Sequence, residues 1–121
     1  MIKPVQKDKP YLPYNGMLGL AEYYPDNAKD FSLTVEIGIG EDGKLGFDNY
    51  QLQVCTTKWL ENEILRNGRP IFIRGMLLVE EYDAKAIQER ISELIKTING
   101  KDWEECNRKI THYFNWEFED A

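Results

Sequence analysis

The amino-acid sequence predicts an α+β fold, in which an antiparallel sheet with an early β-hairpin packs against helices concentrated in the C-terminal half. Three observations predict it. Apolar side chains alternate with small or polar ones over residues 31–39 and again over 50–55. Apolar residues recur at helical spacing later in the chain, within 83–98 and 102–114. Strands that come first and helices that follow are typical of this layered class.

Length and composition bound the domain organisation. The chain has 121 residues, of which 42% are hydrophobic, so we expect one globular domain spanning residues 1–121. No apolar run approaches the roughly 18–20 residues of a membrane-spanning helix. The first ten residues, with Lys3, Lys7 and Lys9, lack the apolar stretch of a secretory signal. We therefore expect a cytoplasmic protein with no membrane contact.

Residues 1–16 are rich in proline and lysine. Pro4, Pro10 and Pro13 discourage regular structure, so the sequence predicts an irregular N-terminal arm. Residues 17–24 are apolar and predict a short first strand, which ends at Pro25.

The hairpin is the clearest prediction. One face of residues 31–39 is apolar throughout, and one face of 50–55 repeats the pattern with Tyr50, Leu52 and Val54. Between them lies Asp42-Gly43, a dipeptide that accepts the positive φ of a tight hairpin turn. We therefore expect an antiparallel hairpin with one buried face.

A helix and a strand follow the hairpin. Thr56 or Thr57 can cap a helix that ends at Asn67-Gly68. This helix has an apolar stripe made of Trp59, Leu60, Ile64 and Leu65, and we expect Trp59 to lie in the core. Residues 71–79 are almost continuously apolar, which predicts a strand covered wholly or partly on both faces.

Two helices end the chain. Asp83 can cap the first, which has an isoleucine-rich face and closes at Asn99-Gly100. Asp102 and Glu105 stand at the positions of a capping box before the second. In the second helix apolar residues recur at helical spacing, namely Trp103, Cys106, Ile110, Tyr113 and Phe114, and we expect Trp103 to lie in the core.

The sequence contains none of the common enzyme motifs. The sequence contains no glycine-rich phosphate loop, no paired-histidine or paired-cysteine metal signature and no Gly-x-Ser-x-Gly elbow. Cys55 and Cys106 fall within apolar patterns and are interpreted as buried thiols, and His112 as a helical surface residue. We expect no enzymatic activity, no cofactor and no metal. An enzyme with a cryptic carboxylate or thiol site remains an alternative.

Negative charge is concentrated late in the chain. Residues 1–79 hold ten acids and nine bases, whereas residues 80–121 hold eleven acids and six bases. Nucleic-acid binding needs clustered Lys and Arg to displace counterions, so we expect no nucleic-acid partner. The excess negative charge of residues 80–121 suits a basic protein partner, and a merely solvated surface is the simpler interpretation.

Three stretches of the chain carry residues that are found together in one known protein family. The first runs from Phe31 to Gly38 and, after the hairpin turn, from Tyr50 to Leu60. The second is Tyr82-Asp83 opening an isoleucine-rich helix, and the third is Trp103 together with Trp116-Glu117-Phe118. With them the chain resembles the immunity protein 8 family of bacterial polymorphic-toxin and contact-dependent inhibition systems.

The resemblance implies a function. Such proteins are not enzymes but bind a cognate toxin domain, often a nuclease, and block it inside the producing cell. An acidic surface would steer the protein onto a basic toxin, and aromatic anchors would slow dissociation. The toxin-contact residues we expect are Glu80, Glu81, Asp83, Trp116, Glu117, Glu119 and Asp120. A small cytosolic binding or adaptor domain outside any toxin system is the alternative, and oligomeric state and toxin chemistry are left open.

Overall fold

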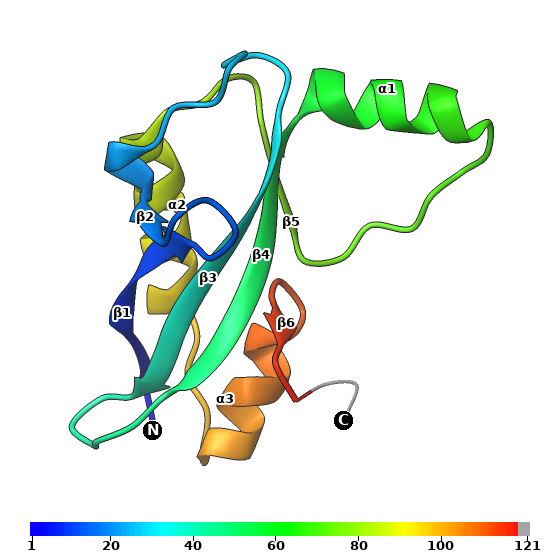
Figure 1. Cartoon of the computed structure of the whole chain (residues 1–121). Helices are drawn as coiled ribbons and strands as arrows, with labels where there is room; N and C mark the ends of the chain where they lie inside the picture. Colours follow the sequence, from blue (N-terminus) through cyan, green and yellow to red (C-terminus); the bar gives the residue numbers. More distant parts are fainter. Residues whose placement is uncertain (119–121) are drawn as a thin grey trace.

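A sheet of six strands forms the centre of the molecule (Figure 1). The computed structural model describes residues 1–118. The strands are β1 Pro4–Leu12, β2 Leu18–Gly19, β3 Ser32–Glu41, β4 Asp48–Thr56, β5 Met76–Val79 and β6 Asn115–Trp116. The helices are α1 Thr57–Asn67, α2 Ala84–Lys96 and α3 Trp103–Ile110, with a short 3-10 turn, η1, at Leu20–Glu22.

Strand order confirms the predicted α+β class. The order is β2-β1-β3-β4-β5, and β6 pairs with the first part of β4. Neighbouring strands are antiparallel except β4 and β5, which run parallel. A parallel pair needs a crossover connection between its strands. That connection contains α1.

The predicted hairpin is confirmed. β3 and β4 pair from Ser32 opposite Cys55 to Ile39 opposite Asp48. Alternate side chains on both strands are buried, and they form the core together with α2 and the end of α3. The buried core residues of these elements are Leu33, Val35, Ile37, Ile39, Tyr50, Leu52, Val54, Ile87, Ile91, Ile95, Ile110 and Phe114. The opposite face of the hairpin carries polar side chains such as Thr34, Gln51 and Gln53, as period-two alternation requires.

The prediction of an irregular N-terminal arm over residues 1–16 is wrong. Residues 4–12 form β1, which pairs antiparallel with β3. β2 pairs only with Tyr11 and Leu12, so most of β1 has no strand on its outer side. The register with β3 also shifts on both sides of Asp8. Proline is tolerated at strand edges and irregularities because its missing N–H is not needed there, and Pro4 and Pro10 are both buried.

Two other strand predictions were too long. Within residues 17–24 only Leu18–Gly19 is a strand, and η1 follows it at once. Within residues 71–79 only Met76–Val79 is a strand, because Gly75 has φ +68° and turns the chain out of the sheet. Residues 71–74 therefore lie outside the sheet, and Phe72 is fully exposed.

The predicted helix caps are confirmed. The side chains of Thr56, Asp83 and Asp102 accept hydrogen bonds from backbone N–H groups in the first turns of α1, α2 and α3. The helix predicted to run to residue 98 ends at Lys96, and Ile98 is buried just beyond it. Trp103 packs partly buried against the core, and its Nε1 donates to Asp48 Oδ2 at 3.2 Å.

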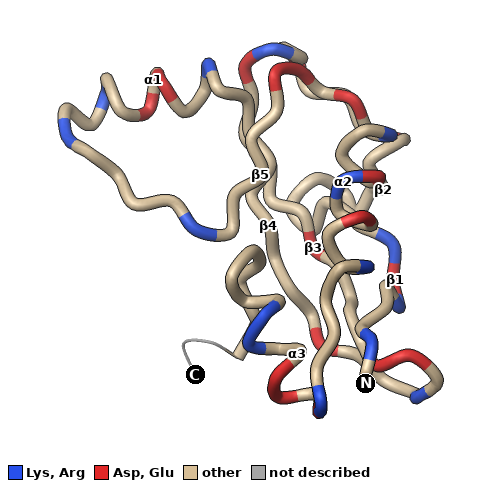
Figure 2. The backbone as a smooth tube through the Cα atoms, turned by 180° about the vertical axis from the view of Figure 1, so that it is seen from behind, with Lys and Arg blue, Asp and Glu red and all other residues tan. Residues whose placement is uncertain are grey.

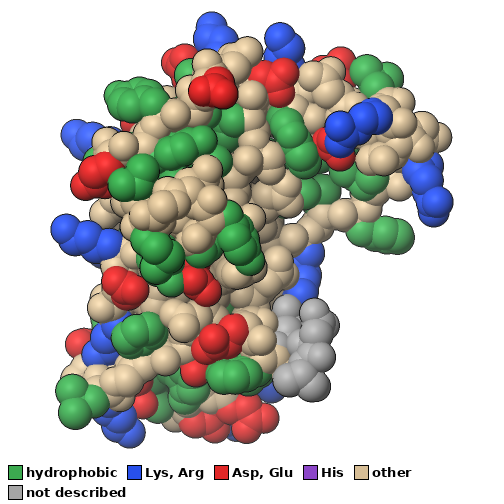
Figure 3. Space-filling model, in the orientation of Figure 1, with side chains coloured by type: hydrophobic (Ala, Val, Ile, Leu, Met, Phe, Trp, Pro, Cys, Tyr) green, Lys and Arg blue, Asp and Glu red, His purple; other side chains and the backbone are tan. Residues whose placement is uncertain are grey.

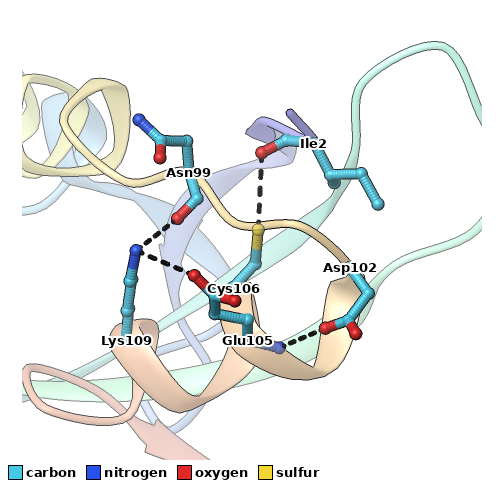
Figure 4. A network of polar contacts seen from close by, with 6 residues as sticks. All are labelled: Ile2, Asn99, Asp102, Glu105, Cys106 and Lys109. Atoms are coloured by element: carbon cyan, nitrogen blue, oxygen red, sulfur yellow. Dashed lines mark hydrogen bonds and ion pairs between the residues drawn. The ribbon is translucent and has the colours of Figure 1, made fainter.

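The N-terminus is fastened to the segment between α2 and α3 (Figure 4). Ile2 and Gly100 exchange two backbone hydrogen bonds, of 2.7 and 3.1 Å. Cys106 Sγ lies 3.5 Å from the carbonyl oxygen of Ile2, and Lys109 Nζ donates to the carbonyl of Asn99 at 2.7 Å. The Cys106 contact joins Ile2, just before β1, to α3, and the Lys109 bond joins α3 to the segment that follows α2.

Candidate functional site

The connection from β4 to β5 projects from the body of the protein. We call residues 57–75 the projecting arm; they comprise α1 and the loop that returns to β5 (Figure 1). Crossover helices between parallel strands ordinarily pack on a face of the sheet. None of the residues of α1 is buried, and the helix extends away from the sheet. The arm therefore has an unusual position for a crossover.

Both ends of the projecting arm are fixed to β4. Thr56 is fully buried, and its Oγ1 accepts hydrogen bonds from the N–H groups of Trp59 and Phe31, each at 3.2 Å. At the other end the carbonyl of Gly75 accepts a hydrogen bond from Gln53 N–H at 2.8 Å. The chain between these points is thus held at its base, whereas its outer part reaches into solvent.

The outer part of the arm exposes large hydrophobic side chains. Leu65 is 72% exposed and Phe72 is fully exposed, while Ile64 and Ile73 are exposed to 40% and 50%. The α1 stripe is therefore exposed, and the predicted core position of Trp59 is wrong, because Trp59 is only half-buried. Figure 3 shows hydrophobic side chains along the arm. Contiguous exposed apolar surface commonly marks an interaction site.

The projecting arm is basic. It contains four bases and two acids, whereas the rest of the chain contains eleven bases and nineteen acids. Lys58 and Arg69 are exposed, Arg66 is paired with Glu63, and Arg74 donates to the carbonyl of Thr111 at 3.3 Å. The arm thus differs in sign from the remainder of the protein.

A second surface is acidic and lies at the same end of the sheet. Tyr82 builds it: its N–H donates to the carbonyl of Ala28 at 2.8 Å and its hydroxyl to the carbonyl of Leu20 at 2.6 Å. These bonds bring η1 and the loop before β3 against the start of α2. Acidic residues lie along these segments (Figure 2), and we call six of them the acidic end: Glu22, Asp26, Asp30, Glu80, Glu81 and Asp83.

The acidic end contains a pocket of about 470 Å³. Leu20, Ala21, Tyr24 and Ala84 contribute apolar surface to it, and Glu81, Asp83 and Lys85 are its charged lining residues. Tyr24 is 79% exposed and tilts toward the ring of Tyr82, with 6.0 Å between ring centroids. Burial, together with the nearby Tyr23, Tyr24 and Glu22 side chains, raises the pKa of Tyr82 to about 12. The Tyr82 hydroxyl therefore remains a neutral donor at ordinary pH.

The structure separates the predicted contact residues into two groups. Glu80, Glu81 and Asp83 are exposed at the acidic end, where Asp83 Oδ1 also accepts the N–H of Ala86 at 3.1 Å. The strand before them ends with Val79 opposite Thr56, whereas Trp116 pairs with Tyr50. Thr56 and Tyr50 are six residue steps apart along β4, which corresponds to about 20 Å.

The second group lies along β4 near the hairpin. Trp116 is half-buried and packs edge-on against Phe118, with 5.5 Å between ring centroids. Glu117 is exposed, and its Oε1 accepts the N–H of Asn49 at 3.2 Å. Glu119 and Asp120, also predicted as contacts, lie outside the described residues. The two groups therefore do not form one continuous patch within residues 1–118.

The groups considered for catalysis are placed as follows. Cys55 and Cys106 are both buried, and burial raises the pKa of each thiol, which disfavours the nucleophilic thiolate. His112 is exposed, with its ring 6.5 Å from that of Tyr113. Within residues 1–118 no three His, Cys, Asp or Glu side chains are grouped so as to hold a metal ion. Over the same residues, no helix has the length and apolar character needed to cross a membrane.

Two other tyrosines have raised pKa values. The Tyr11 hydroxyl donates to the Glu36 carboxylate on the open face of the sheet, and chiefly this bond raises the Tyr11 pKa to about 12. Burial raises the pKa of Tyr50, whose hydroxyl contacts Asn107 Oδ1. Neither residue belongs to the projecting arm or the acidic end.

The sequence predicted the carboxylates of the acidic end after residue 79 but missed the arm. A usable signal was the interruption of the apolar run 71–79 by Arg74-Gly75, with Arg69 and Pro70 just before it. Charges and a glycine inside such a run favour a turn away from the sheet over a buried strand.

Comparison with known proteins identifies the family. The sequence model of immunity protein 8 matches residues 12–121 of the 121-residue chain. No curated protein matches the chain, and neither does any solved structure. Because the match covers nearly the whole chain, including every strand after β1, the projecting arm and the acidic end, the protein belongs to the immunity protein 8 family.

Proposed function

We propose that this protein binds a cognate bacterial toxin domain through the acidic end and neutralises it by a tight protein–protein contact. Membership of the family implies an immunity protein against a toxin. The observation that supports this contact surface is the pocket with apolar walls that Glu81 and Asp83 line, together with exposed acidic residues on the adjoining segments. We further propose that the system is of the polymorphic-toxin or contact-dependent inhibition type, and that the protein acts in the cytoplasm.

Charge and apolar surface contribute differently to such a contact. A toxin that acts on nucleic acid carries a basic surface for its anionic substrate, so the acidic end would accelerate association with it. Exposed Tyr24 and the pocket beneath it offer an aromatic anchor, which would slow dissociation. A basic nuclease is therefore the toxin class that suits this surface best.

Co-expression tests the proposed function. The toxin domain to be co-expressed is the variable C-terminal domain of a large open reading frame upstream of this gene, once that reading frame has been located. Cells that produce the toxin domain should survive with the wild-type chain and die without it. Equal killing in both cases would reject the function.

Charge reversal tests the contact surface. The double variant Glu80→Lys, Glu81→Lys should lower the association rate with the toxin domain at least about tenfold at low salt, with a smaller effect at high salt. Asp83 is left unchanged because it caps α2. Glu104→Lys is the matched control, because Glu104 is exposed on α3, away from the acidic end. An unchanged rate in the double variant would place the interface elsewhere.

A further inference from the structure

We propose that two copies of this chain associate about a twofold axis, with the projecting arm of each copy seated on the acidic end of the other. The first reason is the exposed apolar surface of the arm, which a partner of some kind must cover to remove it from water. The inference does not depend on the proposed function, since it concerns only copies of this chain.

Charge identifies the partner. The arm carries a net charge of +2, and the remainder of the chain carries −8, as the counts of bases and acids given above require. Two arms packed on each other would bring like charges together, which is unfavourable. An arm on the acidic end of a second copy instead meets segments that carry six acidic residues, and the lysines on those segments are Lys29 and Lys85. A second copy therefore offers the complementary charge.

The side chains of the arm and of the pocket are also chemically complementary. On the arm, fully exposed Phe72 stands close in sequence to exposed Arg69. In the pocket, apolar side chains including Leu20 and Tyr24 adjoin the carboxylates of Glu81 and Asp83. In the dimer Phe72 packs against the apolar side chains of the pocket, which buries apolar surface. The guanidinium of Arg69 then lies beside the carboxylates of Glu81 and Asp83, to which it donates hydrogen bonds.

The positions of the arm and the acidic end allow both copies to make the same contact at once. The arm leaves β4 at Thr56, and the acidic residues Glu80 and Glu81 directly follow Val79, which pairs with Thr56. From this junction α1 extends to one side of the sheet, whereas η1 and the start of α2 lie on the other (Figure 1). A twofold axis near the junction would place each arm on the opposite copy's pocket. Such an interface is self-complementary and closes at two copies.

Sedimentation and light scattering on the purified full chain test the association. We expect a monomer–dimer equilibrium at low salt over protein concentrations of about 1–100 μM, with at least about tenfold weaker association at high salt. Phe72→Asp should weaken association at least about tenfold. Leu45→Asp is the matched control, because Leu45 is equally exposed but lies in the β3–β4 turn. A chain that stays monomeric, or equal behaviour of the two variants, would overturn the proposal.

Mixing two charge variants tests the arrangement itself. Arg69→Glu puts a carboxylate beside Phe72 and lowers the net charge of the arm from +2 to zero, and Glu81→Arg puts a guanidinium in the pocket. Each variant alone would bring like charges together at this contact, so its association should be weakened at least about tenfold. In an equimolar mixture every arm can meet a pocket of opposite charge, so a heterodimer should form as readily as the wild-type dimer. Circular dichroism of each variant is the control for folding. Failure of the mixture to recover association would rule out contact between the arm and the acidic end.

Discussion

The hydroxyl oxygen of Thr56 accepts a hydrogen bond from the backbone N–H of Phe31, at 3.2 Å. The Thr56 N–H in turn donates to the Phe31 carbonyl at 3.1 Å. The same hydroxyl caps α1 through the N–H of Trp59, so one buried side chain ties the start of β3 to the root of the projecting arm.

Removing this hydroxyl should cost stability. Thr56→Val keeps the shape of the side chain but leaves two N–H donors without their acceptor, so the free energy of unfolding should fall by about 1–3 kcal/mol in chemical denaturation. Amide hydrogen exchange at Trp59 and Phe31 should accelerate as well. Thr56→Ser keeps the acceptor and is the control, and exchange at these amides as fast in Ser as in Val would contradict this assignment.

The projecting arm should contribute little to the stability of a single copy. Leu65→Ala, at a position 72% exposed, should change the free energy of unfolding by less than about 0.5 kcal/mol. Leu52→Ala removes the same atoms from a position 4% exposed and should cost about 2–5 kcal/mol. Denaturation at low protein concentration measures both. A large loss in Leu65→Ala would mean that α1 packs on its own sheet.

Gly75 and Gly43 form a matched pair for a steric prediction. Both have positive φ, +68° and +83°, so alanine is strained at either position. A Cβ on Gly75 would lie 2.7 Å from Asn115 Nδ2, whereas one on Gly43 would meet nothing within 4 Å. Gly75→Ala should therefore lower the free energy of unfolding about 1–3 kcal/mol more than Gly43→Ala. Adding Asn115→Ala should recover most of that difference, and no recovery would reject the steric cause.

Tyr82 makes the stability of the acidic end sensitive to alkaline pH. Its folded-state pKa of about 12 is above the roughly 10 of an unfolded tyrosine. The stabilisation linked to this shift is fully present below about pH 10 and is lost as the pH rises through about 12. Tyr82→Phe should be less stable by about 1 kcal/mol at neutral pH, because the hydrogen bond to Leu20 is gone.

The same variant should also lose less stability than the wild type between about pH 9 and pH 11.5, measured by urea unfolding at each pH. Parallel decline of the two proteins would show that Tyr82 does not carry this alkaline sensitivity.

Toxin binding and self-association should exclude each other, because we propose that both use the acidic end. Adding the cognate toxin domain to the dimer should give a complex with one copy of each chain, measured by light scattering. A complex that retains two copies of this chain would show that the two surfaces are separate.

Much of the sheet could be predicted because its signals are local. Alternation in residues 31–39 and the Asp42-Gly43 turn determine the hairpin, and the caps at Asp83 and Asp102 determine where α2 and α3 begin. The first strand could not be predicted, because its prolines argue against a strand. They are tolerated because most of β1 has no strand on its outer side and its register against β3 shifts. Those are tertiary properties.

In the candidate site, too, local features could be predicted and features that depend on tertiary contacts could not. An amphipathic helix was predicted over α1, but the spacing of Ile64 and Leu65 does not specify whether their partner is the same sheet or another molecule. The carboxylates Glu80, Glu81 and Asp83 were predicted together because they are adjacent in sequence. Their neighbours Glu22, Asp26 and Asp30 join them only through the hydrogen bonds that Tyr82 makes to Leu20 and Ala28.

The order of elements along the chain has a consequence for synthesis on the ribosome. The hairpin of β3 and β4 is complete at Thr56, but the helix that covers its apolar face begins only at Ala84. Ile2 meets Gly100 later still. The nascent hairpin therefore displays Val35, Ile37 and Leu52 to solvent until most of the chain has emerged, which is a typical condition for aggregation and chaperone binding. Chains released before α3 is made should accumulate as aggregates rather than as partly active protein.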